Sequence, residues 1–97
     1  MTYRKIFVTE PGHDMTTLMK YCERIVFILC GKENFKYVND AAVEVLQDFD
    51  PEEDAFCPTG RSPVNFIIGY LLHDMFPCET INIAVYKNQD YHFEELG

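Results

Sequence analysis

The sequence predicts an α/β fold with a small, mostly parallel sheet, covering helices and a C-terminal antiparallel hairpin. Short runs rich in β-branched and aromatic residues alternate with segments of helical periodicity, which is typical of a parallel sheet. Near the end of the chain, a short polar turn separates two strand-like runs, and this pattern predicts the hairpin. The length of 97 residues corresponds to a single domain over 1–97, and a hydrophobic fraction of 47% suffices for a packed core. The expected element order is β-α-β-α-β-α-β-β.

The first third of the chain is expected to contain two strands. The first covers residues 4–9, where Ile, Phe and Val form an apolar centre before a Pro-Gly break. Asp14 is a candidate N-cap for a short helix over 15–22. The second strand candidate covers residues 24–30, where Arg24 is followed by a continuous apolar run that Gly31 ends. Such a run predicts a strand that is buried on both faces of the sheet.

The middle of the chain is expected to form a helix and a strand. Asn39 is a candidate N-cap for a helix extending to Phe49, because apolar residues recur there at helical spacing. The Asp50-Pro51 pair ends this helix. Residues 54–59 form a weaker strand candidate.

The last part of the chain begins with a third helix, from Pro63 to about Phe76. Ser62 is a good N-cap, and proline is favoured at the first helical position. The helix is apolar on nearly every side, which predicts that it is largely buried against the sheet or a partner subunit. A strand over 81–86, a turn at 88–90 and a strand over 91–96 complete the hairpin.

The charge balance bears on the class of partner. Eight basic and sixteen acidic residues give a net charge of −8, and the basic residues are scattered. This balance argues against direct binding to nucleic acid, because the chain repels phosphate backbones. Two interpretations of the acidic surface stay open: it confers solubility alone, or it docks on a basic surface of another protein.

The four cysteines and the hydropathy pattern bear on the compartment. Cys22, Cys30, Cys57 and Cys78 have no C-x-x-C spacing, and no cluster has the spacing of zinc ligands. The N-terminal residues do not resemble a signal peptide, and the longest near-apolar stretch, 64–72, is too short to span a bilayer. We therefore expect a cytoplasmic protein with reduced thiols, no cofactor and no metal.

The turn between the predicted third strand and the predicted third helix is the candidate ligand-binding site. Thr59, Gly60, Arg61 and Ser62 join the carboxyl end of a strand to a helix N-terminus. Ligands of open α/β sheets bind at such positions, and free N–H groups there attract anions. Pro63 removes one donor, however, and the turn lacks a Walker motif. Binding of a nucleotide or phosphate and ordinary helix capping are the two alternatives.

An acidic run is the candidate surface for protein interaction. It consists of Asp48, Asp50, Glu52, Glu53 and Asp54. As a calcium loop starting at Asp48 it fails, because Glu53 stands where glycine is needed and a threonine replaces the bidentate glutamate. The run is either a solvated turn or a charged patch that docks on a basic surface.

A cysteine and histidine pair is the only nucleophilic arrangement that the chain offers. His13 and Asp14 follow the first strand, so they are placed at the sheet edge expected to carry Cys30 and Arg61. Nothing in the residue spacing supports such a pair, and Cys30 and Cys57 fit buried strand positions. We therefore predict no catalytic residues and no enzymatic activity.

Several motifs are distributed over most of the chain. They are Lys5 to Val8, His13 to Thr16, Tyr21 before Ile25 to Leu29, Phe49-Asp50-Pro51-Glu52-Glu53-Asp54, Thr59-Gly60, Pro63-Val64 and the closing hairpin. Together they resemble a family of short uncharacterised proteins from bacteriophages and other mobile elements. That family more often has an acidic residue and a proline directly after the glycine, whereas Arg61 and Ser62 intervene here. The resemblance implies a phage-type accessory protein of the host cytoplasm, and it implies no catalytic residues.

Three functional hypotheses follow from the sequence. The first is a non-enzymatic protein that binds and modulates a host protein, for example as an inhibitor of a bacterial defence system of the anti-CRISPR kind. The second is a small nucleotide- or phosphate-binding module that uses the turn from Thr59 to Pro63. The third is a structural protein that forms a homodimer through its apolar helix or its hairpin edge.

Overall fold

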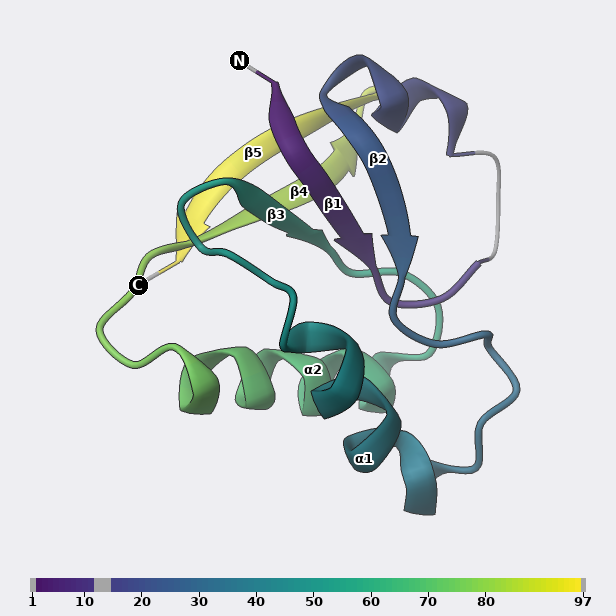
Figure 1. Ribbon diagram of the computed structural model, residues 1–97. Helices are drawn as coiled ribbons and strands as arrows, with labels where there is room; N and C mark the ends of the chain where they lie inside the picture. The colour runs from purple at the N-terminus through teal and green to yellow at the C-terminus, as the bar shows by residue number, and fades with distance from the viewer. Residues whose placement is uncertain (1, 12–14, 97) are drawn as a thin grey trace.

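A five-stranded mixed sheet in the order β2-β1-β3-β4-β5 organises the protein (Figure 1). The computed structural model describes residues 2–11 and 15–96. The strands are β1 (Tyr3–Val8), β2 (Cys22–Phe27), β3 (Asp54–Cys57), β4 (Ile81–Lys87) and β5 (Asp90–Leu96). Strands β1 to β4 are parallel to one another, and β5 pairs with β4 in antiparallel orientation. The predicted α/β class, with a mostly parallel sheet and a closing hairpin, is therefore confirmed.

The sheet separates the core into two layers, one on each of its faces. The α-helices α1 (Phe35–Leu46) and α2 (Ser62–Met75) cover one face of the sheet, as Figure 1 shows. A short 3₁₀ helix, η1 (Thr16–Lys20), packs with the other core. Successive residues of β1 serve opposite faces: Phe7 packs in the core with the two α-helices, and Ile6 packs in the core with η1. Both side chains are almost completely buried.

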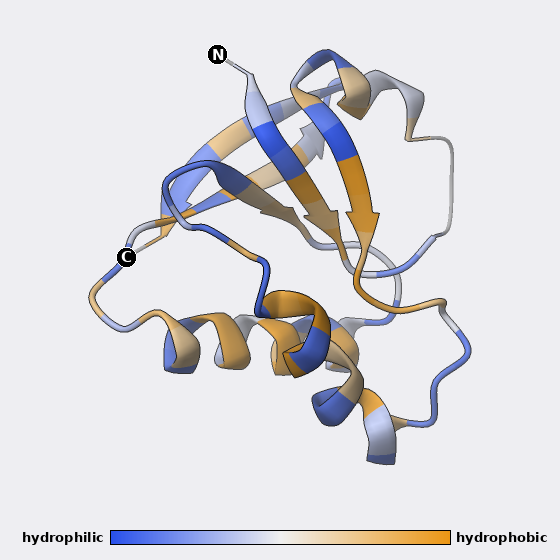
Figure 2. Ribbon diagram, viewed as in Figure 1, coloured by the Kyte–Doolittle hydropathy of each residue, from blue (hydrophilic) through white to orange (hydrophobic). Residues whose placement is uncertain are grey.

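The prediction of a strand buried on both faces was wrong for β2, because Arg24 is exposed and Ile25 and Val26 are only half-buried; the strand lies at the edge of the sheet. The strand also begins earlier than expected and ends at Phe27, which is exposed. The buried residues Ile28 and Leu29 follow it, and their N–H groups donate to the carbonyls of Val8 and Thr9. An apolar run indicates burial but cannot show whether a strand has one neighbour or two. Figure 2 shows that β1 and β2 are hydrophilic in their amino halves and hydrophobic towards the helices.

Helix α1 begins earlier than predicted. Asn34 is its N-cap, and the Asn34 side chain accepts a hydrogen bond from the backbone N–H of Lys36 at 3.0 Å. Asn39, the predicted cap, lies on the exposed side of the helix. The predicted short helix over 15–22 is the 3₁₀ helix η1, and its predicted cap, Asp14, is outside the described residues.

Helix α2 has the expected extent within one residue at each end. Arg61 occupies the N-cap position that was predicted for Ser62, so Ser62 and Pro63 lie in the first turn. The helix is not largely buried by the sheet of its own chain, because Phe66 is 84% exposed and Tyr70 is 69% exposed. One side of the helix packs into the core through Val64, Ile68, Leu71 and Leu72. The opposite side, with its two aromatic rings, has no covering element in the described chain.

The hairpin between β4 and β5 turns at Asn88 and Gln89, as predicted. Both residues have positive φ angles of 54° and 66°. Two successive left-handed residues match the twist of a tight hairpin. The register places Ile81 opposite Leu96 and Ile83 opposite Glu94, so these pairs project from the same face of the sheet.

Candidate functional site

The carboxyl ends of β1 and β3 form the topological switch point of the sheet. The chain passes from β1 to β2 on one side and returns through α1 to β3 on the other side of β1. Ligands of open α/β sheets bind outside such a point. The residues that follow the two strands are Thr9 and Glu10 after β1, and Thr59, Gly60 and Arg61 after β3. The predicted ligand-binding turn is therefore at the switch point.

Hydrogen bonds between these two segments fill the switch point. The Thr59 hydroxyl accepts from the backbone N–H of Glu10 at 3.1 Å and donates to the Glu10 carbonyl at 2.7 Å. The Thr9 hydroxyl accepts from the Thr59 N–H and donates to the side chain of Asn65 on α2. Asn65 in turn donates to the Thr59 carbonyl at 2.9 Å. Together these bonds tie the loops after β1 and β3 to the first turns of α2.

Glu10 and Arg61 form an ion pair at the centre of this network. The Arg61 guanidinium donates to both carboxylate oxygens of Glu10, at 2.7 Å from Nη2 and at 3.1 and 3.2 Å from Nε. The backbone N–H of Arg61 donates to the same carboxylate at 3.0 Å. The Glu10 side chain is only 4% exposed. The bonds from Arg61 hold the pKa of Glu10 below its ordinary value, so the carboxylate stays ionised.

The Glu10 carboxylate occupies the place that an anionic ligand would take at this helix N-terminus. It accepts a hydrogen bond from the backbone N–H of Arg61, and it pairs with the Arg61 guanidinium, the one cationic side chain of the turn from Thr59 to Ser62. Gly60 has a φ of +72°, and a Cβ added there would lie 2.5 Å from a Glu10 oxygen. Ser62 is exposed in the first turn of α2. Of the four predicted ligand-binding residues, Arg61 and Gly60 therefore lie against the Glu10 carboxylate, and Thr59 binds the Glu10 backbone.

The carboxylate of Glu33 binds the loop after β2 at the same edge of the sheet. Glu33 accepts from the backbone N–H groups of Cys30 and Gly31 at 2.9 and 3.0 Å, and Arg61 donates to the Glu33 carbonyl. The bond from Cys30 is the main reason that the pKa of Glu33 falls from 4.5 to about 2. Cys30 is exposed here, in contrast to the expected buried strand position, whereas Cys57 is buried. The predicted companions of Cys30, His13 and Asp14, lie outside the described residues.

The predicted acidic run does not lie on one surface. Asp54 is completely buried, and it accepts from the Arg4 guanidinium at 2.8 and 3.2 Å and from the backbone N–H groups of Lys5 and Asp50. Asp50 is half-buried and accepts from the N–H of Glu52. Asp48, Glu52 and Glu53 are exposed. Asp54 therefore fixes the turn before β3, and only part of the run is accessible to a partner.

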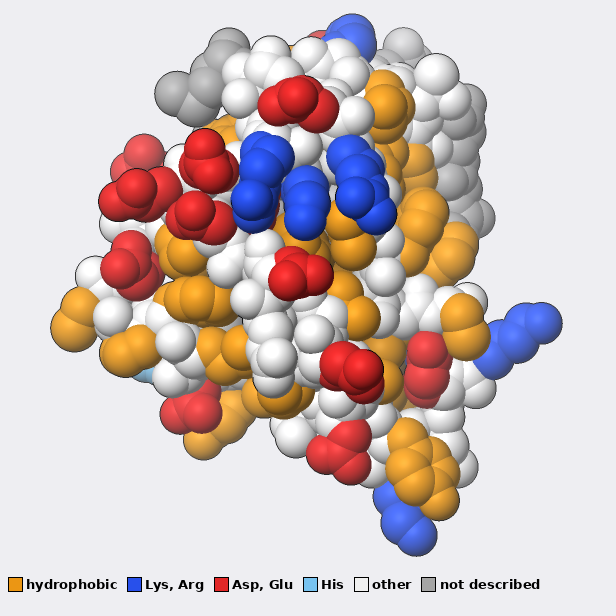
Figure 3. Space-filling model, viewed as in Figure 1, with side chains coloured by type: hydrophobic (Ala, Val, Ile, Leu, Met, Phe, Trp, Pro, Cys, Tyr) orange, Lys and Arg blue, Asp and Glu red, His pale blue; other side chains and the backbone are white. Residues whose placement is uncertain are grey.

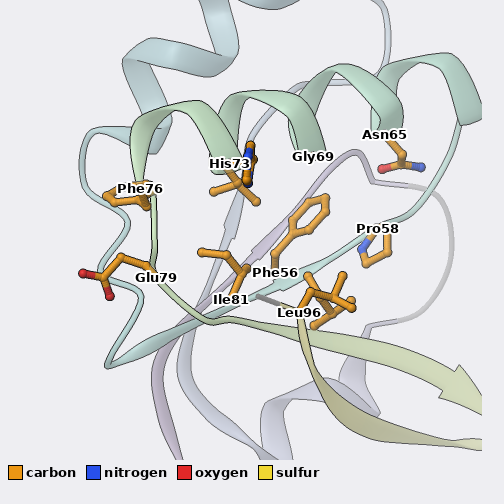
Figure 4. A pocket seen from close by; sticks show the side chains of 11 residues that line it. Phe56, Pro58, Asn65, Gly69, His73, Phe76, Glu79, Ile81 and Leu96 are labelled. Atoms are coloured by element: carbon orange, nitrogen blue, oxygen red, sulfur yellow. The ribbon is translucent and has the colours of Figure 1, made fainter.

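An apolar groove runs beside α2 over the open part of the sheet (Figure 4). Its volume is about 380 Å³, near the lower end of the range of roughly 300 to 1,000 Å³ for small-ligand pockets. Phe56 and Ile81 form the floor in Figure 4, α2 forms one wall with Gly69 at its centre, and Leu96 of β5 lies on the other side. The groove exists because two α-helices do not cover all five strands. Sequence reasoning missed it, since its lining combines α2 with three strands.

The groove is open at Gly69. A Cβ added to this glycine would have no atom within 4 Å. Phe66 lies three residues before Gly69, so the two positions are neighbours on the helix surface, and Tyr70 lies four residues after Phe66 on the exposed side of the helix. Leu96, on the opposite wall, is 57% exposed. An exposed apolar surface of this kind is typical of a binding site.

Acidic side chains surround one end of the groove. Glu79 lines both the groove and an adjoining hollow. Glu52, Asn82 and Glu95 also line this hollow, and the same three residues line a further hollow beside it. We call the exposed carboxylates of these hollows the acidic rim: Glu23, Glu52, Glu53, Glu79 and Glu95. Figure 3 shows acidic side chains gathered on the side of the molecule where β5 meets the turn before β3. Glu52 and Glu53 belong to the predicted run, and the other three come from distant segments.

Comparison with known proteins identifies no relative. No family model, curated protein or solved structure matches the chain. Among residues 2–11 and 15–96, no group of three or more His, Cys, Asp or Glu side chains is arranged to hold a metal ion. Within the same residues, no helix is both long and apolar enough to cross a bilayer.

Proposed function

We propose that this protein is a non-enzymatic binding protein that docks on another protein through the groove beside α2. The observation that carries the proposal is the open apolar groove beside α2, together with the exposed aromatic side chains of Phe66 and Tyr70 on the same helix. Exposed aromatic residues beside a preformed apolar depression are the usual anchors of a protein interface. The narrower proposal, an inhibitor of a bacterial defence system, rests on the resemblance of sequence motifs to phage proteins.

The carboxylates of the switch point favour binding over catalysis. A general acid or base works best when its pKa lies near the operating pH. The pKa values of Glu10 and Glu33 are shifted in the opposite direction, away from neutrality, by the hydrogen bonds that they accept. These carboxylates therefore act in this proposal as fixed structural anions.

The alternative proposal, a nucleotide or phosphate bound at the turn from Thr59 to Ser62, has less support. An anion at this turn has to displace the Glu10 carboxylate from Arg61. Thermal unfolding with a panel of nucleotides and inorganic phosphate tests the alternative, because a ligand that binds the folded state raises the Tm. A rise in the Tm of the wild type that Arg61→Ala abolishes would establish this alternative.

The main proposal is tested by blocking the groove. The tagged protein is used to capture partners from the cytosol of the organism that encodes it, and bound proteins are read by mass spectrometry. Gly69→Leu places a side chain in open space on the groove wall, so it fills the groove without displacing a neighbour. Asn39→Leu adds the same side chain to the exposed side of α1 and serves as the control. A partner retained by the control and lost with Gly69→Leu supports the proposal. A partner that both variants retain contradicts it.

A further inference from the structure

The apolar groove and the acidic rim form one continuous surface. Glu79 lies at the end of the groove and also lines the adjoining acidic hollow. A single peptide segment bound in the groove can therefore also contact the carboxylates of the acidic rim. From this continuity, and resting on the proposed function, we infer that the occupant is a basic amphipathic segment of a partner protein. Its apolar side chains enter the groove beside Gly69, and its Lys or Arg side chains lie along the acidic rim.

The lining of the acidic hollow is mainly negative, although Figure 3 shows Lys and Arg side chains beside the acidic group. Four of the five rim carboxylates line one hollow, whose only basic residue in the described chain is Arg4. The Arg4 guanidinium is already bound by the buried carboxylate of Asp54 at 2.8 Å. No lysine or arginine lines the groove itself among the described residues. The rim therefore presents negative charge to an incoming segment, and complementary charge favours both its encounter and its register.

The shape of the groove agrees with an apolar anchor. Asn65 at one end is held by Thr9 and Thr59, so its polar atoms are engaged within the protein. Between Asn65 and Glu79 the lining is dominated by apolar side chains of β3, β4 and α2. Binding of an amphipathic helix in such a groove is a recurring mode of recognition, in which spaced apolar residues act as anchors.

A second copy of this chain is a poorer occupant on the same grounds. The net charge is −8, and docking two copies through this surface brings like charges together. Glu94 and Glu95 also occupy the edge strand β5 next to Leu96. Charged residues on an edge strand oppose pairing with another strand. These features favour a partner of opposite charge.

The experiment measures binding of two matched peptides of about 16 residues, a length sufficient for a helix. One peptide carries leucine and lysine at helical spacing, and the other carries leucine and glutamate in the same pattern. Binding is followed by titration calorimetry and by chemical shift changes in the ¹⁵N-labelled protein. We expect the basic peptide to bind at least about tenfold more tightly than the acidic one. The shifts should map to Gly69, Phe76 and Leu96.

Two sets of variants localise the binding. Gly69→Leu keeps every charge and should abolish binding of the basic peptide, which separates groove binding from non-specific attraction. The double variant Glu79→Gln with Glu95→Gln should weaken binding by about tenfold or more. The control, Asp40→Asn with Glu44→Gln, removes the same charge from the exposed side of α1 and should leave the affinity unchanged.

The outcomes separate this inference from the proposed function. If both peptides bind equally and Gly69→Leu abolishes both, the groove binds apolar segments but the charge inference is overturned. If neither peptide binds, the inference is overturned, and the docking function is decided by the capture experiment alone. If sedimentation shows a dimer of the wild type that Gly69→Leu dissociates, a second copy occupies the groove and the inference is overturned.

Discussion

The carboxylate of Glu10 and the guanidinium of Arg61, 51 residues apart, lie in direct contact at the switch point of the sheet. Their closest N–O distance is 2.7 Å, and the carboxylate is almost entirely buried. In many α/β proteins this position receives a phosphate or another anion from solution. Here the anion is part of the chain, and it joins the loop after β1 to the start of α2.

Replacing Gly60 by alanine should destabilise the protein more than replacing Gly31. Both glycines have left-handed φ angles, which cost an alanine about 1 to 2 kcal/mol. At Gly60 the added Cβ also meets a Glu10 oxygen at 2.5 Å, whereas at Gly31 the nearest atom is 3.6 Å away. We expect Gly31→Ala to lose about 1 to 2 kcal/mol and Gly60→Ala to lose more. Urea unfolding measures both, and equal losses would show that Glu10 is not held in place.

The stability of the protein should fall in acid because of Glu33 and Glu10. Hydrogen bonds lower the pKa values of both carboxylates in the folded state, that of Glu33 from 4.5 to about 2. The Glu33 contribution is therefore present above pH 4.5 and is lost as the pH falls towards 2. Urea unfolding between pH 7 and pH 2.5 should show a shallower decline for Glu33→Gln than for the wild type. In the exposed control, Glu44→Gln, the decline should match that of the wild type.

Asp54 should be far more important for stability than its neighbour Glu53. Asp54→Ala removes a buried carboxylate that accepts four hydrogen bonds, and it leaves the N–H groups of Lys5 and Asp50 without this acceptor. We expect a loss of about 3 kcal/mol or more. Glu53→Ala changes an exposed side chain and should alter the free energy of unfolding by less than about 0.5 kcal/mol. Similar losses for the two variants would contradict the structural role of Asp54.

The order of strands and helices followed from the sequence because it depends on local periodicity. The partial exposure of β2 did not, because an apolar run cannot reveal that β1 lies between β2 and β3 and leaves β2 at the edge. The N-cap of α1 was misplaced because Asn34 and Asn39 are equally good caps in isolation. Local signals therefore predicted the elements, and tertiary packing decided their limits.

The candidate site was predictable only in part. The turn from Thr59 to Ser62 has a local signature, but nothing near Glu10 indicates that its charge is buried against Arg61. Of the acidic run, Glu52 and Glu53 are exposed and belong to the acidic rim. Its last residue, Asp54, is buried because β3 begins there beside Lys5 of β1. The groove required the strand order, since its walls come from segments that are distant in sequence.

The four cysteines should divide into two reactive and two protected thiols. Cys30 and Cys78 are exposed, whereas Cys22 and Cys57 are buried. Burial raises the pKa of Cys57 to about 11, and that of Cys22 is raised for the same reason, so little thiolate forms at neutral pH. A disulfide reagent at pH 7.5 should therefore modify two thiols of the folded protein rapidly and four after denaturation. Rapid modification of Cys57 in the folded protein would contradict the packing of β3.

Gly69 shows how the groove and the stability of α2 are related. A glycine within a helix is less favourable than alanine by about 0.8 to 1.0 kcal/mol, and a Cβ at this position meets no neighbour. Gly69→Ala should therefore stabilise the protein by about that amount, measured by urea unfolding. A stabilising effect would agree with the proposal that Gly69 keeps the groove wall open for an occupant. The control variant Asn39→Ala changes an exposed position of α1, away from the groove. It should stabilise the protein without any effect on partner capture. If Gly69→Ala destabilised the protein, the glycine would instead serve the packing of α2, and the argument that links it to an occupant of the groove would fail.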